Sequence, residues 1–187
     1  AFRDAVARAG CAIIGKTDRL APADRKLYAL RDVTGTVPSI PLITASIMSK
    51  KLAEGAATLV FDVKCGRGAF MRTPEQARAL AASLLGVGRA LGRNMAALVT
   101  DMDQPLGRAV GNALEVREAV ETLRGGGPGD VRTLTLALAA RMGRLAGIYP
   151  DDAAAARDLA ARLDDGRALQ SFRSMVATQG GDTRVAD

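Results

Sequence analysis

Histidine and tryptophan are absent from the 187-residue sequence, and aromatic residues make up only 3% of it. Without histidine, this chain cannot by itself supply a Ser-His-Asp triad, an imidazole general base or the ligands of a typical zinc hydrolase. The few aromatic rings leave little to stack on nucleic-acid bases. These absences exclude several common classes of hydrolase and argue against a nucleic-acid-binding protein.

Cysteine is also scarce. Cys11 and Cys65 lie too far apart for a C-x-x-C pair, and no histidine could complete a zinc site with them. We therefore expect two reduced thiols in a cytoplasmic protein. The longest apolar runs, such as residues 56–61, are far below the ~18 residues that a membrane span needs, and the chain opens with no secretory leader. Membrane insertion is not expected.

The chain carries a moderate net positive charge, with 26 Lys and Arg against 20 Asp and Glu. The basic residues are scattered, and the longest basic run is Lys50–Lys51. A nucleic-acid footprint needs clustered charge, so we favour a solvated basic surface over a nucleic-acid partner. A chain of this length with 48% hydrophobic residues can bury a core without metals or disulfides.

Three short apolar runs predict buried strands of a parallel sheet, at residues 11–15, 58–63 and 96–100. Helical patterns lie around them, at about residues 2–10, 22–32, 40–54, 74–92, 113–124, 130–146, 152–163 and 166–179. This alternation predicts an α/β fold with a partial parallel or mixed sheet flanked by helices. The C-terminal half is expected to be mostly helical.

Local signals set several helix boundaries. Asn112 followed by Glu115 predicts a capping-box-like start, and Thr73 before Pro74 predicts a helix with proline at its first position. Gly55 predicts the end of the helix that covers 40–54.

Ser46 and Lys50 are four residues apart on the 40–54 helix and so share one face with aliphatic neighbours. Burying a hydroxyl and an ammonium there is costly unless something polar meets them. In one interpretation, Lys50 extends to solvent and the Ser46 hydroxyl forms a hydrogen bond within its own helix. The other is a pocket for an anionic or carbonyl-rich ligand.

Arg31 is a second candidate, at the end of the helical run LYALRD. Its guanidinium is a rigid fork of donors that suits planar acceptors. The alternative is a favourable interaction with the C-terminus of its own helix, which needs no ligand.

The segment DVKCGRGAFM predicts a strand that runs into a G-x-G turn. Gly66 and Gly68 either let the backbone approach a ligand beyond the strand end or permit a positive φ in a tight turn. Asp62, Asp101 and Asp103 also lie at strand ends, where they either bind Mg²⁺ or cap neighbouring loops.

Three long segments, LYALRDVTGTVPSIPLITASIMSKKLAEG, LVFDVKCGRGAFM and ALVTDMDQPLGRAVGNALEVREAVETL, resemble in this order the thymidine and pyrimidine-nucleoside phosphorylase family. The similarity continues to FRSMVATQGGDTRVAD. Family members are more than twice this long, so the resemblance implies a central fragment. It assigns residues 1–22 and 54–187 to an α/β domain and 23–53 to a separate helical (lid) lobe.

Members of that family are glycosyltransferases that use phosphate to cleave a pyrimidine nucleoside, giving free base and pentose 1-phosphate. By resemblance, Arg31, Ser46 and Lys50 hold the base, and two cations plus a hydroxyl match the carbonyl-bearing edge of a pyrimidine ring. The family requires no organic cofactor, and the resemblance implies a homodimer. The phosphate-binding residues and a histidine near the base precede this segment in the family, which implies that the isolated chain is inactive.

Some members of the family also hold a monovalent cation such as potassium, using backbone carbonyls and one carboxylate. The matching positions here are Leu106, Ala109 and Glu118. Oxygen ligands of this kind suit a hard cation.

Two positions depart from the family pattern. Cys65 replaces a usual aliphatic residue, and Arg67 replaces a usual small one, where it either crowds the cleft or contacts phosphate. The alternatives to a pyrimidine-nucleoside phosphorylase are a nucleoside-monophosphate phosphorylase, a related phosphoribosyltransferase, or a non-catalytic fragment that folds only with a partner.

Overall fold

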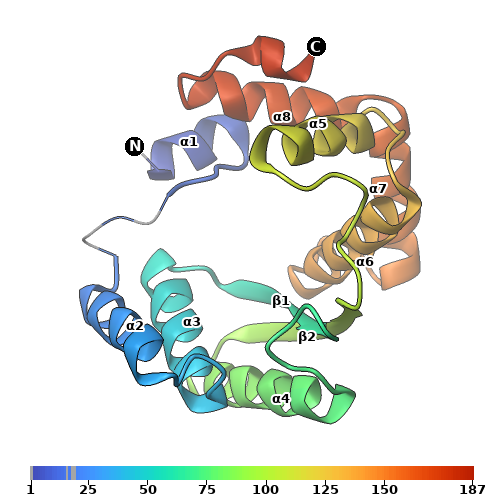
Figure 1. The fold of residues 1–187 in the computed structure, drawn as a ribbon. Coiled ribbons are helices and arrows are strands. Elements are labelled where there is room, and N and C mark those ends of the chain that lie inside the picture. The colour runs from blue at the N-terminus through green and yellow to red at the C-terminus, as the bar shows by residue number, and fades with distance from the viewer. Residues whose placement is uncertain (1, 16, 18–19) are drawn as a thin grey trace. The chain divides into compact units, whose positions relative to one another are not determined.

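A computed structural model of the chain describes residues 2–15, 17 and 20–187 (Figure 1). The elements follow in this order: α1 (Phe2–Ala9), α2 (Pro22–Thr34), α3 (Ile40–Glu54), β1 (Thr58–Cys65), α4 (Pro74–Ala90), β2 (Asn94–Asp101), α5 (Asn112–Leu123), α6 (Gly129–Leu145), α7 (Asp152–Asp164), α8 (Arg167–Thr178) and the short 3₁₀ helix η1 (Thr183–Ala186). The chain divides into two compact units, one built around the sheet and one made of helices.

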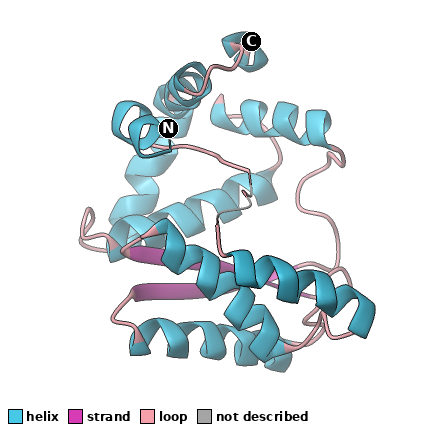
Figure 2. Ribbon diagram, turned by 90° about the vertical axis from the view of Figure 1, so that its left-hand side faces the viewer, coloured by secondary structure: helices cyan, strands magenta, loops and turns pink. Residues whose placement is uncertain are grey.

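The unit that contains the sheet covers Lys16–Pro105 and Arg141–Ile148. Strands β1 and β2 pair in parallel, from Thr58 opposite Asn94 to Cys65 opposite Asp101, and run side by side in Figure 2. Helix α4 packs on both strands, α3 packs on α4, and α2 packs on α3.

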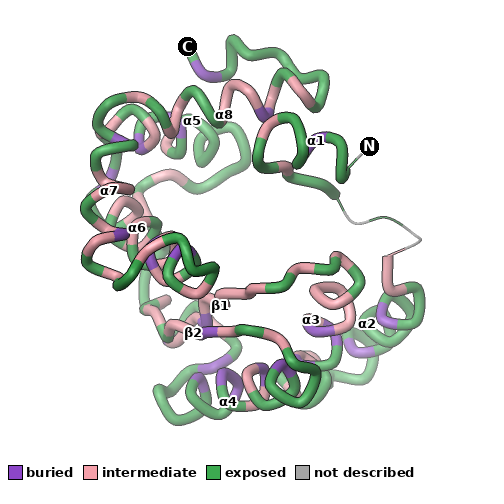
Figure 3. The backbone as a smooth tube through the Cα atoms, turned by 180° about the vertical axis from the view of Figure 1, so that it is seen from behind, coloured by how far each residue is buried: buried purple, intermediate pink, exposed green. Residues whose placement is uncertain are grey.

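The core of this unit gathers around α4, whose inner face is buried in Figure 3. Leu84 is 1% exposed and packs in one cluster with Val63 of β1 and Met48 of α3. Thr44 of α3 also shares a hydrogen bond of 2.8 Å with Ser83 of α4. The helix that carries Ser46 and Lys50 is therefore fixed to the sheet layer through α4.

The other unit covers Ala1–Gly15, Leu106–Ala140 and Tyr149–Asp187, and its described regular elements are helices joined by loops. Helix α8 is central to it, because α8 packs against α1, α5, α7 and η1. The predicted helical C-terminal half is confirmed by α5 to α8, which follow β2.

Helix boundaries follow the predicted caps in most cases. Thr73 and Gln76 form a complete capping box at the start of α4, and Gly55 ends α3 with a positive φ of 80°. The predicted cap at Asn112 is wrong by one residue, because the N-cap of α5 is Gly111. The Glu115 carboxylate still accepts a hydrogen bond from the Gly111 amide, at 2.9 Å.

The predicted strand at residues 11–15 is wrong. This segment has no strand partner among the described residues, and Ile13 is 72% exposed. A side-chain amide takes the place of a neighbouring strand: Gln179 accepts from the Ile13 backbone N–H at 3.1 Å and donates to its C=O at 2.7 Å. Ile13 thus satisfies both of its backbone groups without joining a sheet.

The predicted α/β class is confirmed, with a two-stranded parallel sheet in the described part of the chain. Among the described helices, none combines the length and apolar character that a membrane crossing requires. The division into an α/β domain and a lid lobe at residues 23–53 stays a prediction.

Candidate functional site

A cavity of about 660 Å³ opens within the sheet-containing unit. Its walls come from α2, α3, β1, the loop after β1, and α4. Arg31, Ser46 and Lys50 all line it, although Arg31 lies on a different helix from the other two. The three candidate side chains therefore share one hollow.

Lys50 and Ser46 are bonded to each other across one turn of α3, with 2.7 Å between the ammonium Nζ and the hydroxyl Oγ. The same ammonium donates to the Asp24 carboxylate of α2, also at 2.7 Å. Lys50 therefore does not extend into solvent, and the Ser46 hydroxyl acts as an acceptor for Lys50. Lys50 is held by a contact between two helices, so the interpretation that sends it to solvent is wrong, whereas the Ser46 hydroxyl bonds within its own helix, as that interpretation has it.

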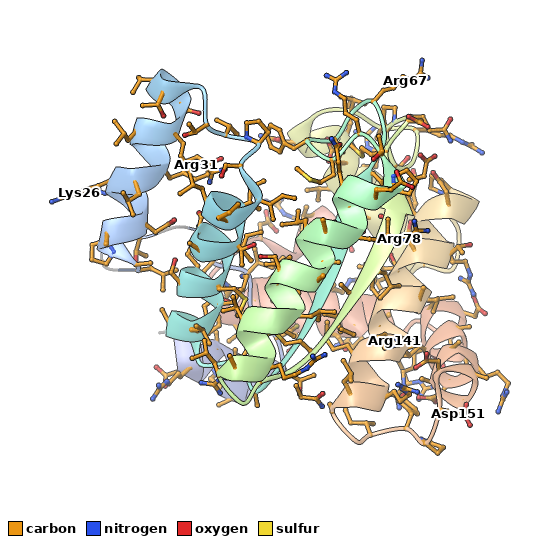
Figure 4. The ribbon with its side chains drawn as sticks, turned by 90° about the horizontal axis from the view of Figure 1, so that it is seen from below. Lys26, Arg31, Arg67, Arg78, Arg141 and Asp151 are labelled. Carbon is orange, nitrogen blue, oxygen red and sulfur yellow. The ribbon has the colours of Figure 1, made fainter. Side chains whose placement is uncertain are left out.

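Arg31 is buried, at 6% exposure. One Nη atom donates to the Val37 carbonyl in the loop after α2, while Nε is buried and has no hydrogen-bond partner among the described residues. An unpaired buried N–H is costly. The guanidinium therefore offers a donor that a ligand carbonyl could satisfy. In Figure 4 the labelled Arg31 extends from α2 toward α3.

The Tyr28 ring lies close to both cations. Its centroid is 5.0 Å from Cζ of Arg31 and 5.9 Å from Nζ of Lys50, which is within cation–π range. Tyr28 follows Asp24 by four residues on α2, so one face of this helix presents the carboxylate, the ring and the guanidinium in sequence.

A polar network occupies the strand side of the cavity. The Lys64 ammonium lies 2.7 Å from the Asp62 carboxylate and donates to the Thr100 hydroxyl at 3.1 Å, and this hydroxyl donates to Asp62. Lys64 and Thr100 are register partners on β1 and β2. Asp62 is therefore neutralised by a lysine and does not face an open cation site.

The G-x-G turn after β1 is shaped by the loop after β2. A Cβ on Gly66, whose φ is +138°, would lie 2.7 Å from the backbone N of Asp103, and a Cβ on Gly68 would lie 2.8 Å from the Met102 carbonyl. Asp103 accepts from the Arg67 amide at 2.8 Å, and Asp101 accepts from the Asp103 amide at 2.9 Å.

These contacts decide between the two predicted roles of the strand-end carboxylates. Asp101 and Asp103 cap loops, and no group of three His, Cys, Asp or Glu side chains in the described part of the chain is arranged to hold a metal. The hypothesis of a Mg²⁺ site at Asp62, Asp101 and Asp103 is therefore wrong.

Arg67 projects from the G-x-G turn, with 84% of its side chain exposed, and lines the cavity in part (Figure 4). Cys65 and Cys11 are free thiols, as expected.

Five cationic side chains and one carboxylate line the cavity: Arg31, Lys50, Lys64, Arg67, Arg72 and Asp62. Aliphatic and aromatic side chains form much of the remaining wall, including Val37, Ile43 and Phe61. Such a cavity suits a flat ligand with carbonyl oxygens or negative charge.

Asp24 is the residue of this site that sequence reasoning missed. A charged residue in the first turn of a helix is usually solvated, so its charge alone gave no signal. Its spacing did carry one, because Asp24, Tyr28 and Arg31 recur at four and three residues and therefore share a face.

The candidate cation ligands lie in the helical unit. The Glu118 Oε2 atom accepts from the amides of Arg108 and Ala109, at 2.8 and 3.1 Å, so this carboxylate reaches the loop that carries Leu106 and Ala109. Its Oε1 atom accepts no hydrogen bond from the described residues, and a Cβ on Gly107 would lie 2.1 Å from it. The role of Leu106, Ala109 and Glu118 as ligands of a monovalent cation stays a prediction.

The loop is also fixed by Asp130, whose carboxylate accepts from the Gly107 amide at 2.9 Å. This hydrogen bond holds the pKa of Asp130 below its ordinary value of 3.8.

The sequence of this chain matches a family of known proteins. The sequence model of the glycosyl transferase family, a/b domain, matches residues 1–169. The chain belongs to this family. Within the family, it is 58% identical over 180 residues to a thymidine phosphorylase of Mycobacterium tuberculosis and 52% identical over 176 residues to a pyrimidine-nucleoside phosphorylase of Staphylococcus haemolyticus. The aligned segments are 96% and 94% of this chain, but only 40% and 41% of those two proteins.

The predicted resemblance to thymidine and pyrimidine-nucleoside phosphorylases is thus confirmed. The chain spans about 40% of the length of these relatives. Membership of the glycosyl transferase family is shown, whereas the roles of Arg31, Ser46 and Lys50 in binding a base stay predictions.

Proposed function

We propose that this chain forms the base-binding part of a phosphorylase that cleaves pyrimidine nucleosides such as thymidine. Phosphate attacks the sugar at C1 and the glycosidic C–N bond breaks, which yields free base and a pentose 1-phosphate. One observation supports this most strongly: a guanidinium, a hydroxyl and an ammonium from two helices line the same cavity. The names of the relatives give the reaction class.

The hydrogen-bond donors of Arg31, Ser46 and Lys50 that the described protein atoms do not use match the acceptors of a pyrimidine base. Arg31 has a buried Nε without a partner among the described residues, Lys50 uses two of its three N–H groups on protein atoms, and Ser46 accepts from Lys50 and so keeps its own hydrogen to donate. A uracil or thymine ring offers two carbonyl oxygens that flank one N–H.

Catalysis would come from charge stabilisation. As the C–N bond breaks, negative charge grows on the departing pyrimidine, and donors already aimed at its oxygens stabilise the transition state more than the substrate. One such preorganised donor is worth about 3 kcal/mol. No side-chain nucleophile is needed, because phosphate is the attacking group and positioning supplies much of the remaining effect.

We also propose the family's remaining features for the complete protein. It takes phosphate as its co-substrate, uses no organic cofactor, and acts as a cytoplasmic homodimer. The loop carbonyls of Leu106 and Ala109 with the Glu118 carboxylate would hold a potassium ion, which supplies fixed positive charge when bound.

A chimera tests the proposed function. The 180 aligned residues of the M. tuberculosis thymidine phosphorylase are replaced by those of this chain, and release of thymine from thymidine and phosphate is measured. We expect turnover by the chimera and none by the 187-residue chain alone. A folded chimera that releases no pyrimidine from thymidine or uridine would contradict the proposal, and preference for thymidine 5′-monophosphate would favour the nucleoside-monophosphate alternative.

A further inference from the structure

We infer that Asp24 is a positioning residue for the base-binding site, because it fixes the Lys50 ammonium at the cavity wall. This inference rests on the proposed function, since it specifies how one of the three donors is aimed. Asp24 itself is not among the residues that line the cavity, so it acts through Lys50 and not by touching the ligand.

The contact between the two side chains is short and shielded. The Lys50 Nζ atom lies 2.7 Å from Oδ2 of Asp24, and the Asp24 side chain is only 7% exposed. The Lys50 side chain is 25% exposed, at the cavity. Water therefore competes little for this carboxylate, and the pair is not an ordinary surface salt bridge.

Lysine needs such a contact to be a directed donor. Its ammonium sits on a flexible stem of four carbons, and its three N–H groups carry no fixed direction of their own. Asp24 and Ser46 accept two of these N–H groups. The third is then fixed in direction by the tetrahedral geometry at Nζ and is left for a ligand acceptor.

The pair also joins two helices at the site. Asp24 lies in the first turn of α2, and Lys50 lies in the last turns of α3. On α2, Arg31 is seven residues after Asp24 and shares its face. The ion pair therefore sets the position of the helix that carries the guanidinium relative to the helix that carries the other two donors.

A double-mutant cycle tests the inference. Thymine is titrated into the full 187-residue chain and into variants carrying Asp24→Asn, Lys50→Met, or both, and the dissociation constants are measured by NMR. We expect Asp24→Asn to weaken thymine binding at least tenfold in the chain with Lys50, and less than twofold in the Lys50→Met background. A purely structural role for Asp24 would weaken binding equally in both backgrounds, which would overturn the inference.

Asp32→Asn is the matched control, because Asp32 is an exposed carboxylate on the same helix, and it should leave binding unchanged. If circular dichroism shows that the Asp24→Asn variant does not fold, the double-mutant cycle is repeated with Asp24→Ser, whose smaller side chain leaves room for water. Tight thymine binding that is unaffected by Asp24→Asn overturns this inference alone. Failure of the unmodified chain to bind thymine overturns the proposed function together with it.

Discussion

At the residue scale, the candidate site is built from polar side chains that are buried. Ser46 and Arg31 are each only 6% exposed, although serine and arginine side chains are mostly exposed in folded proteins. Each carries a donor that the described protein atoms do not fully use. Their burial at one cavity is easier to explain by a ligand than by stability.

Removing the Lys50 ammonium should impair the reaction directly. In the chimera, we expect Lys50→Ala to lower kcat/KM for thymidine at least tenfold, or about 1.4 kcal/mol. Lys51→Ala is the control, because Lys51 pairs with Glu54 on the same helix and its side chain is 40% exposed. Equal kinetics for the two variants would remove Lys50 from the site.

Asp130 should give a local pH response in the loop of the candidate cation site. The hydrogen bond from the Gly107 amide lowers the pKa of Asp130 from its ordinary value of 3.8. Its contribution to stability is therefore complete above pH 3.8 and is lost as the pH falls through the lowered pKa. The Gly107 amide shift, followed by NMR, should therefore titrate with a midpoint below 3.8. The transition should be absent in Asp130→Asn, and a midpoint at or above 3.8 contradicts the contact.

At the element scale, the ends of the helices were predictable where a residue type has one favourable place. Thr73 with Pro74 and Gln76 gives a start that few other conformations satisfy, and Gly55 gives an end because its positive φ is strained for other residues. The strand at 11–15 was not predictable, because an apolar run does not reveal whether a partner strand exists. Here Gln179, which is 166 residues from Ile13 in the sequence, replaces one.

The capping box of α4 should be measurable as stability. Thr73→Ala removes the side-chain acceptor for the Gln76 amide and should cost about 1 kcal/mol in chemical denaturation. Ser39→Ala is the matched control, because Ser39 is also an N-cap with proline in the first turn but makes no side-chain capping bond. Similar losses for both variants would show that the Thr73 bond contributes nothing specific.

At the scale of the whole molecule, the family and its fold class were predictable from motifs in order, whereas the site was predictable only in part. Arg31, Ser46 and Lys50 could be found from resemblance and helical spacing, and the cavity brings them together. Asp24 could not be identified in the same way, because its importance arises from the packing of α2 on α3, which brings together residues 26 apart in sequence.

The narrow sheet has a consequence for the chain on its own. Within the described residues, β1 and β2 pair only with each other as strands, and open strand edges promote association. We expect analytical ultracentrifugation to show species larger than a monomer as concentration rises. Val99→Lys on β2 should reduce this association more than Val110→Lys, which changes an exposed residue outside the sheet. A monomer at every concentration would contradict the expectation.

The most direct measurement is a crystal structure of the active chimera with thymine bound. The ring should lie in the 660 Å³ cavity, with its O2 and O4 atoms within hydrogen-bond distance, about 3.2 Å, of donors on Arg31, Ser46 and Lys50. Thymine bound elsewhere, or a ring in this cavity whose oxygens meet none of the three side chains, would contradict the assignment of this site.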